Sequence, residues 1–312
     1  MKACLWVALQ LLFFHAFGQT RADLESKQVM LPTGWKLSPV GSSISLGDLP
    51  LNICIAPNQK IAAVTNNGQS KQSIQLIDLK NQQVLHTQEI GKAWLGLAFS
   101  NDSKTLYASG GNDNWIIRYS VENNRLITRD TLTIGKPWPT RISIAGMTLD
   151  DSRGRLYVVT KDNNSLYVVD TRSKKIIQQI SLPAEAYTCL LSPNKKILYV
   201  SCWGCDKILT VDTQALTITH QIQVGDNPND MTITKNGKYL FVANANDNSV
   251  SVIDTQLQKE IEVLNTALYP NAPSGSTTNG VALSEDKKTL FIANADNNCI
   301  SVFDVSNPGS SK

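Results

Sequence analysis

Histidine is scarce in this sequence, which limits the chemistry that it can carry. The 312 residues include three histidines, and only His86 and His220 lie beyond residue 18. Both fall in segments expected to form outer β-strands, where a lone histidine is more often a surface residue than a ligand. This scarcity disfavours haem ligation, a Ser-His-Asp triad and histidine-based zinc sites. No G-x-S-x-G, P-loop or dinucleotide motif occurs either, so we expect no cofactor and no catalytic residues.

Strong charge is also absent. The formal net charge is +3, and the chain has no block of Lys/Arg and no acidic tail. A nucleic-acid-binding protein needs clustered basic residues to displace counterions from phosphates. We therefore expect no nucleic-acid partner, and we interpret the charged residues as a solvated surface.

Only one long apolar run is present, and it lies at the beginning of the chain. Met1-Lys2 precedes ACLWVALQLLFFHAF, and Ala16 and Gly18 supply small residues where a signal peptidase cleaves. This run is too short to span a bilayer comfortably, and no second one follows. Residues 1–18 are therefore predicted to be a cleaved signal peptide, and the mature protein is predicted to be soluble and secreted or periplasmic, without a transmembrane segment.

An internal repeat determines the expected architecture. Residues 240–254 read LFVANANDNSVSVID, and related copies end at Asp78, Ser120, Asp170, Asp212, Asp254 and Asp304, with spacings of 42, 50, 42, 42 and 50 residues. Each copy shows short alternating strands bounded by turn residues, without a helical period. This pattern predicts an all-β β-propeller of four-stranded antiparallel blades, with six repeats visible.

The ends of the repeat region suggest how the ring closes. The sixth copy lacks its fourth strand, and residues 44–52 align with residues 222–230, which include the end of a fourth strand. We therefore expect an N-terminal strand to complete the last blade and close the ring. The resulting division is a lead-in at 19–43, a propeller at 44–305 and a tail or linker at 306–312.

The repeat resembles a known family. The pattern L-[YF]-V-[AS]-N-x-x-D-N-[ST]-[VI]-S-V-[IF]-D-T, with Tyr157-Val158-Val159-Thr160 and Tyr199-Val200-Ser201 as core words, is similar to the YVTN repeat of YncE-like propellers. The resemblance implies a propeller fold over about residues 44–305. Family members usually have seven blades, so a seventh repeat in a longer parent is an alternative to six. Some larger bacterial proteins place such a propeller ahead of a phosphoesterase domain, which implies a covalently linked domain of that kind.

One face of the expected propeller collects aromatic and amide residues. With the strands of a blade labelled a to d from first to last, the d–a loops and the b–c turns lie at the same end. We predict that this face binds a small ligand or a protein partner; the alternative is that the tryptophans fill gaps between blades. The candidate residues are Trp94, Trp115, Trp138, Arg141, Tyr187, Trp203, Asn229, Asp230 and Asn279.

The central channel offers a second possibility. The inner strands begin near Asn52, Gly96, Gly146, Thr188, Asp230 and Gly280, so either a channel-mouth pocket or close packing around the axis is expected there. A metal-dependent lactonase is the alternative to a non-catalytic binding protein, and Asn52, Asn229 and Asp230 are its best metal ligands, with Arg141 as an oxyanion partner. No axial glutamate supports it. The Asn/Asp turns and the repeated Asp of the c–d turn are interpreted as structural.

Five cysteines remain beyond residue 18, and two of them form the motif SCWGCD. Cys202 aligns with Asn244 and Asn294 of sister repeats, and Cys205 aligns with Asp247 and Asn297. The motif is therefore a b–c turn, in which residues three apart come within about 7 Å. A disulfide between Cys202 and Cys205 is the leading prediction, ahead of free thiols and of a redox or metal role, because exported proteins form disulfides.

Overall fold

The computed structural model describes residues 28–31, 34–37 and 41–312, which divide into two compact units, 1–43 and 44–312. The described part of the first unit is a hairpin of β1 (Val29–Met30) and β2 (Lys36–Leu37), in which Val29 pairs with Leu37. The predicted signal peptide at 1–18 lies outside the described residues.

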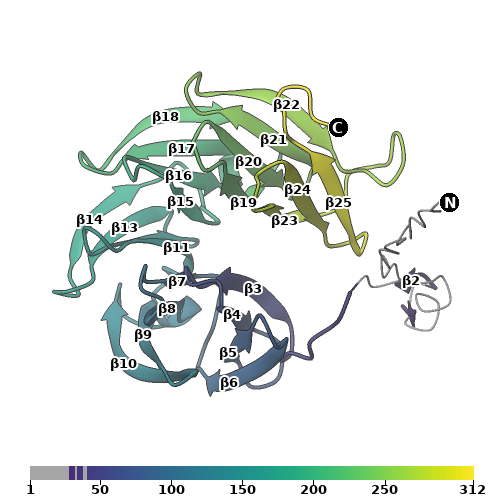
Figure 1. Cartoon of the computed structure of the whole chain (residues 1–312). Helices are drawn as coiled ribbons and strands as arrows, with labels where there is room; N and C mark the ends of the chain where they lie inside the picture. The colour runs from purple at the N-terminus through teal and green to yellow at the C-terminus, as the bar shows by residue number, and fades with distance from the viewer. Residues whose placement is uncertain (1–27, 32–33, 38–40) are drawn as a thin grey trace, which may run out of the picture. The chain divides into compact units, whose positions relative to one another are not determined.

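The second unit consists of six antiparallel sheets arranged as the blades of a propeller (Figure 1). The first three blades are formed by β3 (Pro50–Ile55), β4 (Ile61–Asn66), β5 (Ser73–Asp78) and β6 (Gln83–Glu89); by β7 (Leu97–Phe99), β8 (Thr105–Ser109), β9 (Trp115–Glu122) and β10 (Arg125–Thr133); and by β11 (Ile144–Asp150), β12 (Arg155–Thr160), β13 (Ser165–Asp170) and β14 (Ile176–Ser181). The predicted all-β, six-bladed propeller is therefore confirmed.

The remaining three blades follow in the same order. They are formed by β15 (Cys189–Leu191), β16 (Ile197–Cys202), β17 (Lys207–Asp212) and β18 (Thr217–Gln223); by β19 (Pro228–Ile233), β20 (Tyr239–Asn244), β21 (Ser249–Asp254) and β22 (Lys259–Asn265); and by β23 (Thr278–Leu283), β24 (Thr289–Asn294) and β25 (Cys299–Asp304). Two single-turn 3₁₀ helices, η1 (Gly111–Asp113) and η2 (Trp203–Cys205), lie in b–c turns where the sequence pattern indicated no helix.

The hydrophobic core lies between the blades. Phe241 and Val252 of the fifth blade pack in one buried cluster with Val281 and Leu290 of the sixth, and equivalent clusters join the earlier neighbours. Because both faces of a blade in the middle of the series contact a neighbouring blade, its inner strands are apolar on both sides, as in β20, where every residue after Tyr239 is buried. Burial of this kind on two faces is the main term that stabilises the ring.

The expected closure by the N-terminus is not found. The sixth sheet has three strands, and β3 pairs with β4 as the inner strand of the first blade. The alignment of 44–52 with 222–230 combines the end of β18 with the start of β19, and only residues 50–52 of the first segment form a strand. Within the described residues, the outer edge of β25 is bonded at one end, where Asp304 and Lys312 exchange backbone hydrogen bonds of 2.6 and 2.9 Å.

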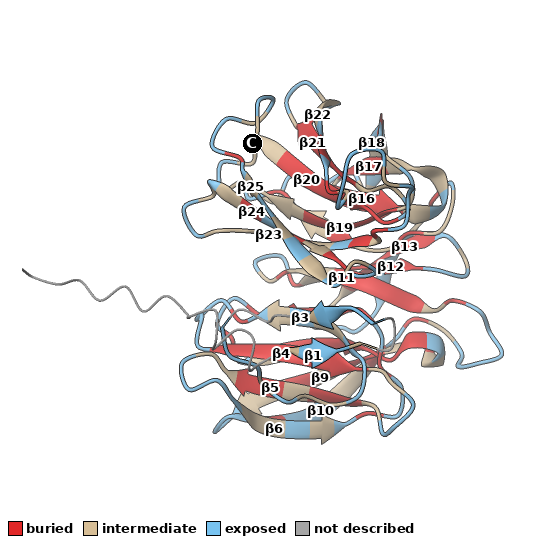
Figure 2. Ribbon diagram, turned by 90° about the vertical axis from the view of Figure 1, so that its right-hand side faces the viewer, coloured by how far each residue is buried: buried red, intermediate tan, exposed pale blue. Residues whose placement is uncertain are grey.

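The first and sixth blades consequently expose apolar faces that are buried elsewhere. We call these faces the seam; they carry Ile53 and Ile55 on β3, Phe291 on β24, and Ile300 and Val302 on β25. Phe291 is 42% exposed, whereas its counterpart Phe241 in the fifth blade is 0% exposed. Ile53 is 59% exposed, whereas its counterpart Met231 is 6% exposed. Figure 2 looks onto this side, where β3 is drawn partly exposed and β20 largely buried.

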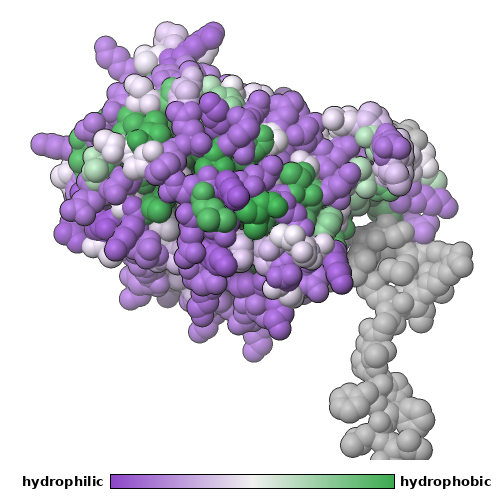
Figure 3. Space-filling view, turned by 90° about the horizontal axis from the view of Figure 1, so that it is seen from above, coloured by the Kyte–Doolittle hydropathy of each residue, from purple (hydrophilic) through white to green (hydrophobic). Residues whose placement is uncertain are grey.

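The rest of the surface is more ordinary. The face seen in Figure 3 is mostly hydrophilic, with apolar side chains gathered in a band across it. Apolar atoms normally make up a large share of a folded protein's surface, so this band needs no special function. No helix among the described residues is long and apolar enough to cross a membrane.

Candidate functional site

The repeated Asp of the c–d turn is structural. Asp78, Asp170 and Asp212 each accept hydrogen bonds on Oδ1 from the backbone N–H groups two and three residues further on, at 2.6 to 3.1 Å. The bond from the third residue is the main cause that lowers the pKa of each of these carboxyl groups. The interpretation of this Asp as a self-bonding turn residue is confirmed.

The Asn residues of the b–c turns hold the long loops in place. The buried Asn114 has a left-handed backbone (φ 57°) and donates from Nδ2 to the carbonyls of Lys136 (2.6 Å) and Thr140 (2.8 Å). Asn248, at the equivalent position three blades later, donates to Pro273 O (2.8 Å) and accepts from Ser276 N (2.7 Å). These two repeats have the 50-residue spacing, so each extended d–a loop is fixed by one amide side chain.

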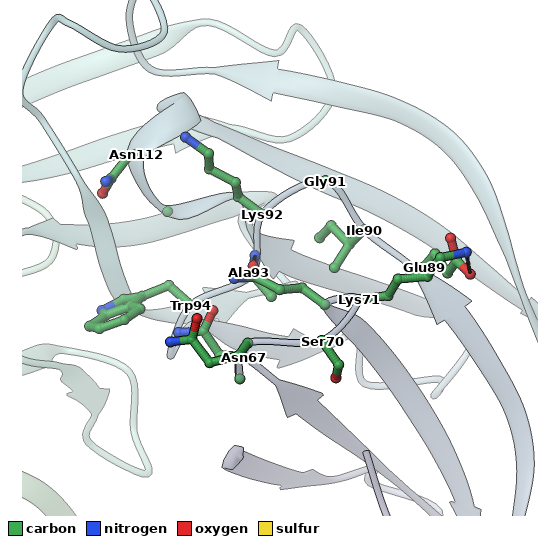
Figure 4. A pocket seen from close by; sticks show the side chains of 14 residues that line it. Asn67, Ser70, Lys71, Glu89, Ile90, Gly91, Lys92, Ala93, Trp94 and Asn112 are labelled. Carbon is green, nitrogen blue, oxygen red and sulfur yellow. Dashed lines mark hydrogen bonds and ion pairs between the residues drawn. The ribbon is translucent and has the colours of Figure 1, made fainter. Parts of the chain in front are cut away.

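A cavity of about 680 Å³ lies where the first and second blades meet. It is at the end of the propeller that carries the d–a loops and the b–c turns, which we call the loop end. We call this cavity the loop pocket. Its walls are the b–c turn 67–72, the d–a loop 90–94 and the start of η1, and Figure 4 shows Asn67, Lys71, Lys92, Trp94 and Asn112 around it. The turn has three more residues than its counterparts, and this extra length forms one wall.

Hydrogen bonds fix the walls of the loop pocket. Gln72 accepts from Ala93 N on its side-chain oxygen (2.6 Å) and from Ile90 N on its carbonyl (3.1 Å), which joins the turn to the opposite loop. Lys71 pairs with Glu89 at 2.8 Å, but both side chains are exposed, so this ion pair adds little stability. The pocket is therefore a preformed polar recess beside one indole ring.

A second cavity, of about 500 Å³, lies at the channel and reaches the seam; we call it the channel pocket. Asn52, Tyr187, Thr188 and Asp230 line it together with apolar residues that include Phe291. Of the three axial glycines, Gly96 and Gly146 are in tight contact with the next blade, while a Cβ on Gly280 would meet only ordinary neighbours, including Asp230 Oδ2 at 3.8 Å. Close packing and a pocket therefore occur on different sides of the axis.

Asp230 is the unusual group of the channel pocket. Its Oδ1 accepts from Met231 N at 2.9 Å and its Oδ2 accepts from Val281 N at 3.0 Å. Burial nevertheless raises the pKa of Asp230 to about 6, because the two backbone bonds only partly offset the loss of water around the charge. Burial, with the nearby Asp230 charge, also raises the pKa of Tyr187 to about 12, so this phenol stays neutral.

The remaining candidate residues are spread over several places. Trp138 is 53% exposed on the loop between β10 and β11, and the Arg141 guanidinium lies 5.4 Å from its ring centre. Trp115 packs over Gly110, where a Cβ would overlap its ring. The buried Asn229 donates to Asn279 Oδ1 at 2.7 Å.

The structure thus divides the nine predicted residues between the loop pocket, the channel pocket and separate positions, of which the one at Asn229 is buried. Trp94 lines the loop pocket, and Tyr187, Asp230 and Asn279 line the channel pocket. Sequence reasoning missed Lys71, Gln72, Glu89 and Asn112, although the extra residues in the first repeat were a visible signal. The suggested metal set also separates: the Asn229 amide is directed to Asn279, and the described residues contain no group of three or more His, Cys, Asp or Glu that could hold a metal.

The C-x-x-C motif forms a closed turn in the fourth blade. Cys202 and Cys205 are joined in a disulfide with their Cα atoms 5.6 Å apart, around η2. The sister repeats use hydrogen bonds here, since Asn244 Nδ2 donates to Ser249 and Ser251 at 2.9 Å. Trp203 lies within this turn, and its carbonyl accepts from Asn227 Nδ2 at 2.8 Å. The motif therefore serves as a local cross-link at the loop end.

The six antiparallel blades define this chain as a β-propeller. The model of the YNCE-like beta-propeller family matches residues 24–310, and the chain belongs to that family. The match begins within the segment 19–43 that we expected to precede the propeller.

Among curated proteins, the chain is similar to Antigen Lp49 of Leptospira interrogans serogroup Icterohaemorrhagiae serovar copenhageni (strain Fiocruz L1-130). The two are 33% identical over 143 residues, which is 43% of this chain and 29% of that protein. The chain therefore aligns with less than a third of its curated relative.

Solved structures show the same fold. The chain resembles a chain of Kuenenia stuttgartiensis hydrazine synthase (TM-score 0.68, 17% identity, 85% of this chain and 79% of that one). It also resembles U3-55K (TM-score 0.69, 12% identity, 85% and 80% covered) and the WD40 repeats of RRP9 (TM-score 0.70, 12% identity, 85% and 79% covered). Identities this low carry the fold alone.

Proposed function

We propose that this protein is an exported, non-catalytic binding scaffold that holds a small ligand or a protein partner at the loop pocket. The observation that supports it best is the recess beside Trp94, which the lengthened turn of the first repeat walls on one side. Export rests on the signal-like residues 1–18. By its resemblance to propeller–phosphoesterase proteins, the chain would serve as the recognition part of a longer parent.

The chemistry of the loop pocket suits binding rather than catalysis. Trp94 is partly exposed and offers a flat apolar surface, while Asn67, Gln69 and Asn112 offer amide donors and acceptors around it. Lys71 pairs with Glu89, and Lys92 pairs with Asp113 at 3.4 Å, so each lysine of the pocket has an acidic partner. Indole faces surrounded by amides on rigid loops recognise ligands through stacking and hydrogen bonds.

A lactonase-like hydrolase at the channel mouth is the second candidate. It is favoured by one observation, the half-buried Asp230, whose carboxyl has a pKa of about 6 and lines the same pocket as Asn52. Metal analysis of the purified protein tests it. A stoichiometric divalent ion that is lost in Asp230→Ala would favour the hydrolase over the non-catalytic scaffold.

Binding at the loop pocket can be tested through the indole N–H signals of the protein in NMR spectra. A library of small polar fragments is titrated against wild type, Trp94→Ala and the control Trp35→Ala, which also removes an exposed tryptophan but in the first unit. We expect fragments that shift the Trp94 signal and that bind Trp35→Ala unchanged but not Trp94→Ala. Fragments that all bind elsewhere, or that bind Trp94→Ala equally well, would contradict the proposal.

A further inference from the structure

The channel pocket combines one carboxylate with a largely apolar lining. Asp230 is its single acidic residue, and its lining contains no Lys, Arg or His. None of the ion pairs among the described residues involves Asp230. A carboxylate withdrawn from water without a cationic partner is costly for the fold, which makes it available to a cation from outside.

We propose that the channel pocket binds a small organic cation, an amine whose ammonium group pairs with Asp230 and whose apolar part lies along Phe291 and Ile300. This site is separate from the loop pocket, so the inference goes beyond the proposed function and does not depend on it.

The carboxylate is held ready for such a partner. The N–H groups of Met231 and Val281 each donate to one carboxylate oxygen, which fixes the orientation of Asp230 and leaves further lone pairs on both oxygens. Gly280 contributes no side chain, and the space a Cβ would occupy is 3.8 Å from Asp230 Oδ2. An ammonium group next to the carboxylate would form a charge-assisted hydrogen bond in a partly desolvated site.

The lining favours an amine over a metal ion. Calcium requires six to eight oxygen ligands, and magnesium requires octahedral oxygen coordination, whereas this pocket offers one carboxylate. Asn52 Nδ2 donates to Leu95 O at 2.6 Å, so Asn52 could add one neutral amide oxygen to this set. The apolar residues Leu51, Phe291 and Ile300 on the other side suit a hydrocarbon or aromatic body. Cation and apolar body are therefore both accommodated.

Titration supplies a separate signature. The titratable groups that face the pocket are Asp230 of the fifth blade and Tyr187, just before the first strand of the fourth blade. The other lining residues do not titrate. Tyr187 stays neutral because its pKa is about 12. Since the pKa of Asp230 is about 6, amine binding should strengthen as the pH rises from 5 to 7.

Calorimetric titration with 2-phenylethylamine and its neutral analogue 2-phenylethanol tests the proposal. We expect wild type to bind the amine at least tenfold more tightly than the alcohol, and Asp230→Asn to lose that preference. Gly280→Leu should also block the amine, because it fills the recess and keeps the carboxylate. The control Trp94→Ala should bind the amine as wild type does.

The opposite results are equally clear. Equal binding of amine and alcohol, no binding of either, or full amine binding by Gly280→Leu and Asp230→Asn would overturn the proposal. Competition by calcium chloride at stoichiometric amounts would replace it with a metal site. Loss of fragment binding in Trp94→Ala bears on the loop pocket alone, so failure at one pocket is distinguishable from failure at the other.

Discussion

The seam predicts that two equivalent phenylalanines stabilise the protein by very different amounts. Phe241 of β20 and Phe291 of β24 occupy the same position in successive repeats, opposite Val252 and Val302. Phe241 is 0% exposed between two blades, so Phe241→Ala should cost about 3–5 kcal/mol of unfolding free energy through lost transfer energy and a cavity. Phe291 is 42% exposed and borders no second blade, so Phe291→Ala should cost about 1–2 kcal/mol.

Urea unfolding followed by far-ultraviolet circular dichroism measures both values under one extrapolation. A second matched pair, Ile53→Ala and Met231→Ala, repeats the comparison on the opposite side of the seam, where Ile53 is exposed and Met231 is buried. If Phe291→Ala costs as much as Phe241→Ala, with equal denaturant slopes, the sixth blade is covered in solution and the open seam is refuted.

Three further predictions concern single groups. The folded-state pKa of Asp230 is about 6, above the value of about 3.9 in an unfolded chain, so the folded state binds more protons between these two values and stability should fall as the pH rises. The unfolding free energy of wild type relative to Asp230→Asn should drop by about 2 kcal/mol from pH 4 to pH 7. A difference that does not change with pH would refute the raised pKa. Asn114→Ala should lower the unfolding free energy by about 2–4 kcal/mol and should speed hydrogen exchange at Ser143 N, which donates to Asn114 Oδ1 at 2.9 Å. Asn112→Ala, at an exposed position, should change the unfolding free energy by less than about 0.5 kcal/mol. Equal exchange rates at Ser143 N in wild type and Asn114→Ala would argue against the anchoring role. Alkylation of the unreduced protein followed by peptide mass spectrometry should leave Cys202 and Cys205 unlabelled, and labelling of both would exclude the disulfide.

The fold could be predicted from the sequence because its information is local and repeated. Each copy places apolar residues on both sides of its strands, and five of the six copies end in an Asp, such as Asp170, which bonds the backbone of the turn that follows. A strand pattern that recurs six times at a fixed period identifies the fold even where a single copy is ambiguous. The axial position of Asp230 also followed from the register alone.

The closure of the ring and the composition of the pockets could not be predicted in the same way. Residues 44–52 resemble the end of one strand together with the start of another, and only three-dimensional pairing shows that residues 44–49 add no strand to the sixth blade. The loop pocket depends on bonds across blades, such as Ala93 N to Gln72, which no pattern within one repeat encodes. Trp94 and Trp115 were both predicted to lie on the loop face, yet Trp115 packs on Gly110 and Trp94 lines the loop pocket.

Crystallographic fragment screening tests the central claim, that this propeller binds ligands in recesses at its loop end, most directly. Crystals soaked with a few hundred small fragments, including simple amines, would show where bound molecules gather. The account predicts that polar fragments cluster beside Trp94 and that amines cluster at Asp230. Fragments absent from both cavities, or scattered without preference over the surface, would contradict it.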